Sequence, residues 1–199
     1  VDVYRAENKL YQLYIAKKCG LKVPNTKVAN TSNIDIDVDR DYVIKSLDTA
    51  LFFDLKNNKE MFTYSNVVTG KEFKEYELNQ APVFIQDFLN PKIDCRITYV
   101  GGNQFPVWIK KNGRGIYGDW RFQKDSLDYI PFELPEEVEV AIKQLMRELH
   151  LNFGGIDLAY VDGEYYFIEV NPTGEWGWLE VKTGIQISMH IKKFLCSEV

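Results

Sequence analysis

The stretch FIEVNPTGEWGW, residues 167–178, begins as a strand and ends in polar chemistry. Its first residues are mostly apolar and aromatic or β-branched, which favours a β-strand. Glu169 and Asn171 stand two residues apart, so on a strand both side chains point to the same face. A turn at residues 172–174 and two tryptophans follow. An acid and an amide at the end of an apolar strand predict a polar site there.

The preceding strand, GGIDLAYV at residues 154–161, carries Asp157, and the Asp-Gly pair at 162–163 predicts a hairpin. A two-residue turn in an unbroken ladder would pair Asp157 with Ile168 and put Glu169 on the other face. A three-residue loop or one bulge would put both carboxylates on the same side. Two carboxylates and the neighbouring amide oxygen are the hard ligands that Mg²⁺ prefers. Solvent-exposed acids on a strand are the alternative interpretation.

Three basic residues stand in apolar surroundings. Lys45 follows Tyr-Val-Ile, Arg96 lies between a cysteine and an isoleucine, and Arg121 lies in GDWRF. An arginine inside an apolar context needs an anionic partner. Each of the three could pair with an acid of the chain itself. Together with the acid cluster, they predict that a metal and cations grip a polyanion such as a nucleotide triphosphate.

Composition narrows the class of protein. The chain has 199 residues, of which 45% are apolar, so it should bury a substantial core. A net charge of −5 argues against binding to nucleic acid or to an acidic membrane surface. Cys19, Cys95 and Cys196 are scattered, which predicts neither a disulfide framework nor a zinc site and favours a reduced, cytoplasmic setting. No apolar run has the length of a membrane span.

The order of elements predicts a mixed α+β fold with mostly antiparallel strands. Apolar periodicity predicts helices over residues 5–19, 135–149 and 184–195. The expected strands are 41–47, a pair within 51–64 with KNNK as the turn, 81–89, a hairpin over 94–111 around residues 101–103, and the hairpin over 154–171.

Several motifs, in this order, resemble the ATP-grasp superfamily: YVIKSL, VFIQDFL, DCRITYVGG, DWRF and the ending NPTGEWGW. The chain is most similar to the peptide-modifying ligases of the microviridin, or graspetide, branch, whose DWR step and NPxGxWxW ending match residues 119–121 and 171–178. Ribosomal-protein glutamate ligases and glutathione synthetases are more distant relatives. The resemblance implies an ATP-grasp fold with two α+β lobes, residues 1–86 with the leading helix and residues 87–199 with the hinge and metal site.

The resemblance also implies the contacts with ATP. Lys9 and Lys45 would reach the nucleotide phosphates. Gln86 and the backbone of Asp87 and Leu89 would meet the adenine at the hinge between the lobes.

The remaining site residues implied by the resemblance belong to the second lobe. Asp94 would meet the ribose, while Arg96 and Arg121 would stabilise the γ-phosphate and an acyl-phosphate. The magnesium ions would be held by Asp157, Glu169 and Asn171. The two tryptophans after the turn would either wall the acceptor pocket or pack in the core.

The activity implied by the resemblance is ATP-dependent ligation of a carboxylate to an amine or hydroxyl through an acyl-phosphate, with ATP and Mg²⁺. The substrate would be a ribosomal precursor peptide or another carboxylate. We expect neither nucleic acid nor a membrane as a partner, and the chain could form a homo-oligomer. One alternative is an ATP-grasp ligase that joins an amino acid to a protein or small molecule. Another is a nucleotide-binding module without turnover.

Two features depart from the family pattern. The segment after Lys45, KSLDTALFFD, has no glycine, although many ATP-grasp proteins carry a glycine-rich loop there. Members of the family also carry an N-terminal domain before the ENK at residues 7–9, and we expect that domain to be missing here.

Overall fold

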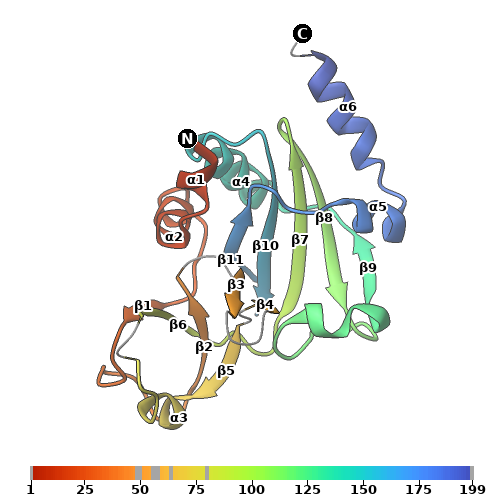
Figure 1. Ribbon diagram of the computed structural model, residues 1–199. Helices are drawn as coiled ribbons and strands as arrows, with labels where there is room; N and C mark the ends of the chain where they lie inside the picture. Colours follow the sequence, from red (N-terminus) through yellow and green to blue (C-terminus); the bar gives the residue numbers. More distant parts are fainter. Residues whose placement is uncertain (1, 48–50, 55–58, 63–64, 79–80, 198–199) are drawn as a thin grey trace. The chain divides into compact units, whose positions relative to one another are not determined.

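The computed structural model describes residues 2–47, 51–54, 59–62, 65–78 and 81–197. The chain forms two compact units: Val1–Val23 together with Asn90–Val199, and Pro24–Leu89. Each unit combines helices with an antiparallel sheet (Figure 1), so the α+β fold class is confirmed.

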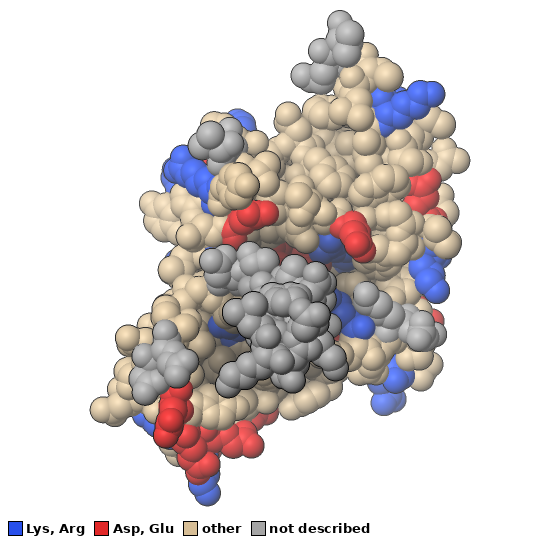
Figure 2. Space-filling view, viewed as in Figure 1, with Lys and Arg blue, Asp and Glu red and all other residues tan. Residues whose placement is uncertain are grey.

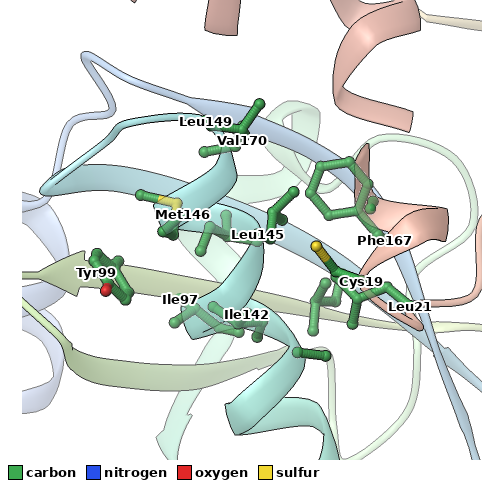
Figure 3. Close-up of a cluster of buried hydrophobic side chains, with 14 of the residues drawn as sticks. Cys19, Leu21, Ile97, Tyr99, Ile142, Leu145, Met146, Leu149, Phe167 and Val170 are labelled. Atoms are coloured by element: carbon green, nitrogen blue, oxygen red, sulfur yellow. The ribbon is translucent and has the colours of Figure 1, made fainter. Parts of the chain in front are cut away.

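A five-stranded antiparallel sheet forms the centre of the larger unit, in the order β11-β10-β7-β8-β9. One face packs on helix α4 (Glu136–Glu148), whose Leu145 and Met146 are fully buried. Figure 3 shows these side chains beside Ile97 and Phe167 of the sheet. The expected hairpins and the α4 helix are therefore confirmed. The strands are β7 (Ile93–Val100), β8 (Asn103–Lys110), β9 (Asp128–Pro131), β10 (Phe153–Val161) and β11 (Glu164–Asn171).

The leading segment forms two helices, α1 (Asp2–Ala6) and α2 (Lys9–Lys18), instead of the single helix expected over 5–19. The break has a local cause, because Asn8 is extended and its Oδ1 accepts a 2.9 Å hydrogen bond from the Tyr11 N–H, which caps α2.

The leading helix was expected to belong with lobe 1–86, and it packs instead on the larger unit. Gln12 of α2 is buried, and its Nε2 donates to the carbonyl of Val170 at 2.8 Å. Its Oε1 accepts from the Val170 N–H at 3.0 Å, so α2 is bonded to strand β11. The division into lobes at residue 86 and the hinge stay predictions.

The β10–β11 hairpin contains the irregularity on which the site depends. Asp162 and Gly163 both have positive φ and form a two-residue turn between paired Val161 and Glu164. The register then shifts, because Leu158 pairs with Phe167 and Asp157 pairs with Glu169. Ile168 is the extra residue of a β-bulge.

The opposite face of the five-stranded sheet is partly covered by two C-terminal helices, α5 (Gly177–Thr183) and α6 (Ile187–Ser197). Leu179 of α5 and Ile187 of α6 are fully buried with Val107 of β8. In Figure 1 helix α5 lies beside β8 and β9, and helix α6 lies beyond the hairpin end of β7 and β8. The rest of this face, over β10 and β11, carries charged residues. The closing helix was expected over 184–195, and α5 was not expected.

The smaller unit holds a four-stranded antiparallel sheet in the order β1-β6-β2-β5, with helix α3 (Gly70–Lys74). Tyr42, Val68, Phe73 and Ile85 form its core. A separate strand pair confirms the strands expected within 51–64, and their turn at 55–58 lies outside the described residues. The strands are β1 (Thr26–Ala29), β2 (Asp41–Ser46), β3 (Leu51–Asp54), β4 (Lys59–Phe62), β5 (Asn66–Thr69) and β6 (Val83–Asp87).

The surface of the smaller unit is rich in acids. Figure 2 shows acidic side chains gathered around the region that carries α3 in Figure 1. Exposed acids of this unit include Asp35, Asp37, Asp39, Asp41, Glu72, Glu75 and Glu77. The net negative charge of the chain is thus concentrated in part on this unit.

All three cysteines are free thiols, with Cys19 and Cys95 buried. Within the described ranges, no helix combines the length and apolar character needed to cross a membrane.

Candidate functional site

Three strands bring one charged residue each to the same face of the larger sheet. Arg96 of β7 pairs in register with Asp157 of β10, which pairs in register with Glu169 of β11. Residues directly opposite in an antiparallel ladder have side chains on the same face. The bulge at Ile168 therefore produces the shared face that the sequence left open, and the hypothesis of a bulged hairpin is confirmed.

Arg96 is a buried arginine with a carboxylate partner. Only 6% of the residue is exposed, and its Nη1 donates to Asp157 Oδ1 at 2.9 Å. The expectation that an arginine on this apolar strand needs an anion is confirmed, and the anion is an acid of the chain itself, which is the alternative that the sequence left open. The pair joins β7 to β10 by a side-chain contact in addition to their backbone ladder.

Arg121 reaches the same cluster from a loop. It lies in the 3₁₀ segment Trp120–Ser126, and Asp119 caps that segment by accepting from the Arg121 N–H at 3.0 Å. The guanidinium donates to Asp119 Oδ2 at 3.1 Å, to Asp157 Oδ2 at 3.1 Å and to Glu169 Oε1 at 3.3 Å. Burial lowers the pKa of Arg121, but the three carboxylates outweigh it and raise the pKa above its ordinary value. Arg121 therefore stays charged.

The loop that carries Arg121 is anchored by aromatic packing. Trp178 of α5 lies with its ring centroid 5.4 Å from Trp120 and 5.3 Å from Tyr129 of β9. Trp120 is buried in this cluster. Of the two interpretations of the tryptophans, core packing thus describes Trp178, whose contacts connect the NPTGEWGW segment to the DWR segment.

Asp94 lies on the same face of β7 as Arg96, two residues earlier. Lys92 Nζ donates to both of its oxygens at 2.5 Å. Burial raises the pKa of Asp94 to about 6, Lys92 opposes that rise, and the nearby charges of Asp157 and Asp119 add to it. The proposed ribose contact of Asp94 stays a prediction.

The oxygen donors fit Mg²⁺ by their chemistry. Asp157 and Glu169 offer carboxylates on one face, and Asn171 follows on the same strand. The Asn171 Oδ1 accepts from the Thr173 N–H at 2.9 Å and from its hydroxyl at 3.1 Å, so it shapes the turn after β11. The described residues contain no group of three or more His, Cys, Asp or Glu side chains that could hold a metal. A magnesium site here would use the two carboxylates, and the ligand role of Asn171 stays a prediction.

The smaller unit brings together two of the expected nucleotide contacts. Lys45 pairs in register with Phe84, and Val43 pairs with Gln86, so Lys45 and Gln86 lie on one face of the four-stranded sheet. Gln86 is buried, and its Nε2 donates to Thr26 Oγ1 at 2.9 Å.

The other expected nucleotide contacts lie at element ends. The Asp87 carboxylate lies 3.5 Å from Arg40, and its N–H donates to the Asn25 carbonyl at 3.0 Å. Leu89 is the last residue of the smaller unit, and Lys9 is the first residue of α2 in the larger unit. Their contacts with a nucleotide stay predictions.

Two glycines of the site were not singled out from the sequence. Gly155 and Gly174 both lie against the guanidinium of Arg96. A glycine inside an apolar strand is a signal of close approach by another group, and the Gly154-Gly155 pair carried that signal.

No family model and no curated protein matches the chain. Solved structures do match it. A RiPP-associated ATP-grasp ligase from Chryseobacterium gregarium, in complex with ADP and a leader and core peptide, is 31% identical over 100% of this chain and 62% of its own, with a TM-score of 0.85. The macrocyclase MdnC from Microcystis aeruginosa MRC, bound with precursor peptide MdnA, is 27% identical over 98% of this chain and 61% of its own, with a TM-score of 0.80.

A more distant structure shares the fold alone. The D-alanine–D-alanine ligase from Bacillus anthracis is 17% identical over 96% of this chain and 65% of its own, with a TM-score of 0.63. This chain spans less than two thirds of the length of each of the three proteins. It has the ATP-grasp fold, and its structural neighbours include RiPP-associated ATP-grasp ligases, as the resemblance of its sequence implied.

Proposed function

We propose that this chain provides the ATP-binding and phosphoryl-transfer part of an ATP-dependent ligase that joins a carboxylate to an amine or hydroxyl. The observation that carries the proposal is the cluster in which Arg96 and Arg121 hold Asp157, with Glu169 brought to the same face by a bulge. Bulges of this kind re-aim side chains next to active sites. The structural neighbours bound to ADP and peptides support the same assignment.

The charge of the cluster supports a requirement for a divalent cation. Asp119, Asp157 and Glu169 contribute −3, and Arg96 with Arg121 contributes +2, so the cluster carries −1. A net negative cluster repels a triphosphate. Mg²⁺ held by Asp157 and Glu169 would reverse that sign and neutralise phosphate charge.

Two guanidiniums beside the same carboxylate support a role in stabilising the charge that develops in phosphoryl transfer. In the proposed reaction the γ-phosphoryl group of ATP passes to an oxygen of the substrate carboxylate, which gives an acyl-phosphate and ADP. An amine or hydroxyl then attacks the acyl carbon, loses its proton and displaces phosphate. Arg96 and Arg121 would stabilise the transferred group as planar donors of several N–H bonds. No nucleophilic residue of the protein is needed.

The proposed substrate is a precursor peptide. Two solved structures at 31% and 27% identity hold peptides, in one case a leader and core peptide and in the other the precursor peptide MdnA. A free amino acid as the acceptor remains the rival ligase, and a module that binds nucleotide without turnover remains the rival of another class.

The test compares nucleotide binding by Glu169→Gln and by the parent chain, using calorimetry with ATP in the presence and absence of Mg²⁺. The substitution removes one charge and one ligand while keeping the shape of the side chain. We expect the parent to bind ATP more tightly with Mg²⁺ and the variant to lose most of that gain. Glu164→Gln is the matched control, since Glu164 lies at the other end of the same strand and pairs with Lys22 at 2.8 Å.

Equal Mg²⁺-dependent binding by Glu169→Gln and the parent would overturn the metal assignment. Turnover is tested separately by ATP hydrolysis with and without a precursor peptide, and by mass spectrometry for the loss of one water per bond formed. Peptide-stimulated hydrolysis supports the peptide ligase. Stimulation by a free amino acid favours the rival ligase, and nucleotide binding without hydrolysis under any of these conditions favours the binding module.

A further inference from the structure

The guanidinium of Arg96 lies flat against two glycines from separate segments. A Cβ built on Gly155 of β10 would lie 2.2 Å from Arg96 Nη2, 2.5 Å from Cζ and 2.9 Å from Nε. A Cβ on Gly174, in the turn after β11, would lie 2.8 Å from Nη2. Neither glycine has a positive φ, so space and not backbone conformation requires glycine at both positions.

Hydrogen bonds alone do not fix the orientation of this guanidinium. Among the described residues, its one hydrogen-bond partner is Asp157, reached by Nη1, and the buried Nε has no partner. A buried donor without an acceptor costs free energy, so it persists where the surrounding packing imposes it. The two glycines are part of that packing, because a side chain on either would occupy the space that the guanidinium now fills.

The two glycines are themselves held in place by the strands of the site. Gly155 pairs in register with Asn171 of β11. The Gly174 N–H donates to the Asn171 carbonyl at 3.1 Å, which closes the turn, and a Cβ on Gly174 would also lie 2.9 Å from the Gly155 nitrogen. The turn after β11 therefore brings Gly174 against both Gly155 and Arg96.

We infer that Gly155 and Gly174 are positioning residues that set the place of the Arg96 guanidinium and, through its Nη1, that of the Asp157 carboxylate. The functional part of this inference rests on the proposed function, in which Arg96 contacts the γ-phosphate. The steric part concerns the fold alone. The experiment separates the two.

The steric part is tested by a double-mutant cycle of urea unfolding with Gly155→Ala and Arg96→Met. We expect Gly155→Ala to lower the unfolding midpoint clearly when Arg96 is present. Most of that loss should vanish in the Arg96→Met background, because the flexible methionine leaves room for the new methyl group. If Arg96→Met does not fold, Arg96→Lys replaces it, since it keeps the charge for Asp157 without the rigid plane. An equal loss in both backgrounds overturns the inference.

Two other glycines provide controls for this cycle. Gly154 precedes Gly155, and its Cβ would meet Met146 Cε at 3.2 Å on the core face. Gly154→Ala should therefore cost the same with and without Arg96. Gly177→Ala fills open space in α5 and should leave the midpoint unchanged or raise it slightly, because alanine favours a helix more than glycine does. Gly174→Ala should keep part of its cost in both backgrounds, because it also meets the backbone of Gly155.

The functional part is tested by the ratio of the affinities for ATP and ADP, both with Mg²⁺. A displaced Arg96 would lose the γ-phosphate, so Gly155→Ala should weaken ATP binding by about tenfold while ADP binding changes little. A purely structural role would weaken both alike. If the parent binds both nucleotides and Gly155→Ala leaves the ratio of the two affinities unchanged, the functional part of the inference is overturned. If the parent binds neither, the proposed function fails, and the unfolding cycle still decides whether the glycines position Arg96.

Discussion

Arg96 and Arg121 hold the same carboxylate, Asp157, under opposite conditions. The Arg96 side chain is 7% exposed, comes from a central strand and, within the described part of the chain, donates a hydrogen bond to Asp157 only. The Arg121 side chain is 38% exposed, comes from a 3₁₀ segment and is shared among three carboxylates. The site thus has a buried side formed by the sheet and a partly solvent-exposed side formed by a loop.

The contrast indicates that two different kinds of interaction hold the two arginine side chains in place. Arg96 is placed by packing against glycines in a low-dielectric environment, where charge and shape both matter. Arg121 is placed by the attraction of several acids in a partly hydrated environment, where salt screens that attraction. Substitutions that change space should therefore disturb the first, and ionic strength should disturb the second.

The largest effect on stability should come from Arg96→Met. This change leaves Asp157 without its buried partner, although Asp157 keeps its contact with Arg121, and breaking such a buried pair costs up to about 3–5 kcal/mol. Urea or guanidinium unfolding measures the difference from the parent. A loss no greater than that of the corresponding Arg121 variant would erase the distinction between the two sides.

The pH dependence of the free energy of unfolding tests whether the sheet side of the site, where Asp94 lies, is shielded from water. Burial and nearby charges raise its pKa from 3.8 to about 6 in the folded chain. Between pH about 4 and 6 the folded state then binds the proton more tightly than the unfolded chain does, so stability falls as pH rises through this window. The full effect is about 3 kcal/mol.

Unfolding free energies at several pH values would show this effect. We expect Asp94→Asn to lose less stability than the parent between pH about 4 and 6. Asp128→Asn, which changes an exposed aspartate of β9, serves as the matched control and should follow the parent. Parallel curves for Asp94→Asn and the parent would show that Asp94 is well hydrated.

Trp178→Ala tests how the loop side is anchored. The substitution removes the contacts with Trp120 and Tyr129, and we expect a loss of about 2 kcal/mol because the ring is only partly buried. Chemical unfolding checks the value. Val181→Ala, at a position of the same helix that is 85% exposed, should have almost no effect. If the two variants are equally stable, the aromatic contact does not support the DWR segment.

The smallest effect on stability should come from Arg121→Gln. A partly exposed arginine shared among acids contributes at most about 1 kcal/mol, and salt screens the contribution. Unfolding in low salt and in about 1 M NaCl should show a small difference from the parent that disappears at high salt. A large loss that persists at high salt would place Arg121 in the same class as Arg96.

Much of the sheet architecture could be predicted from the sequence. Alternation and turn residues indicated the hairpins of β7–β8 and β10–β11, and the apolar context of Arg96 indicated a buried ion pair. The sequence left open whether Asp157 and Glu169 lie on the same face or on opposite faces of the hairpin, because nothing in the run YYFIEV marks Ile168 as the bulged residue. Pairing across strands decides that point, and it is a property of the assembled sheet.

Other features escaped prediction for identifiable reasons. The split of the leading helix was encoded in Asn8, whose capping ability competed with a continuous apolar pattern. Helix α5 begins with Gly177 and has no side-chain cap, so it carries no start signal. The leading helix joins the larger unit through Gln12, a polar residue whose burial depends on the carbonyl and N–H of a strand far away in the sequence.

The bulge at Ile168 also has a consequence for how such chains can be recognised. Because Ile168 is an additional residue in the ladder, a chain without it would place Glu169 opposite Asp157 through an unbroken two-residue hairpin. Two sequence spacings, which differ by one residue, therefore describe the same pair of carboxylates. A motif search that fixes the number of residues between the two acids would therefore separate proteins that share one arrangement. Deleting the bulged residue would shorten the strand and still leave each side chain on its present face of the sheet.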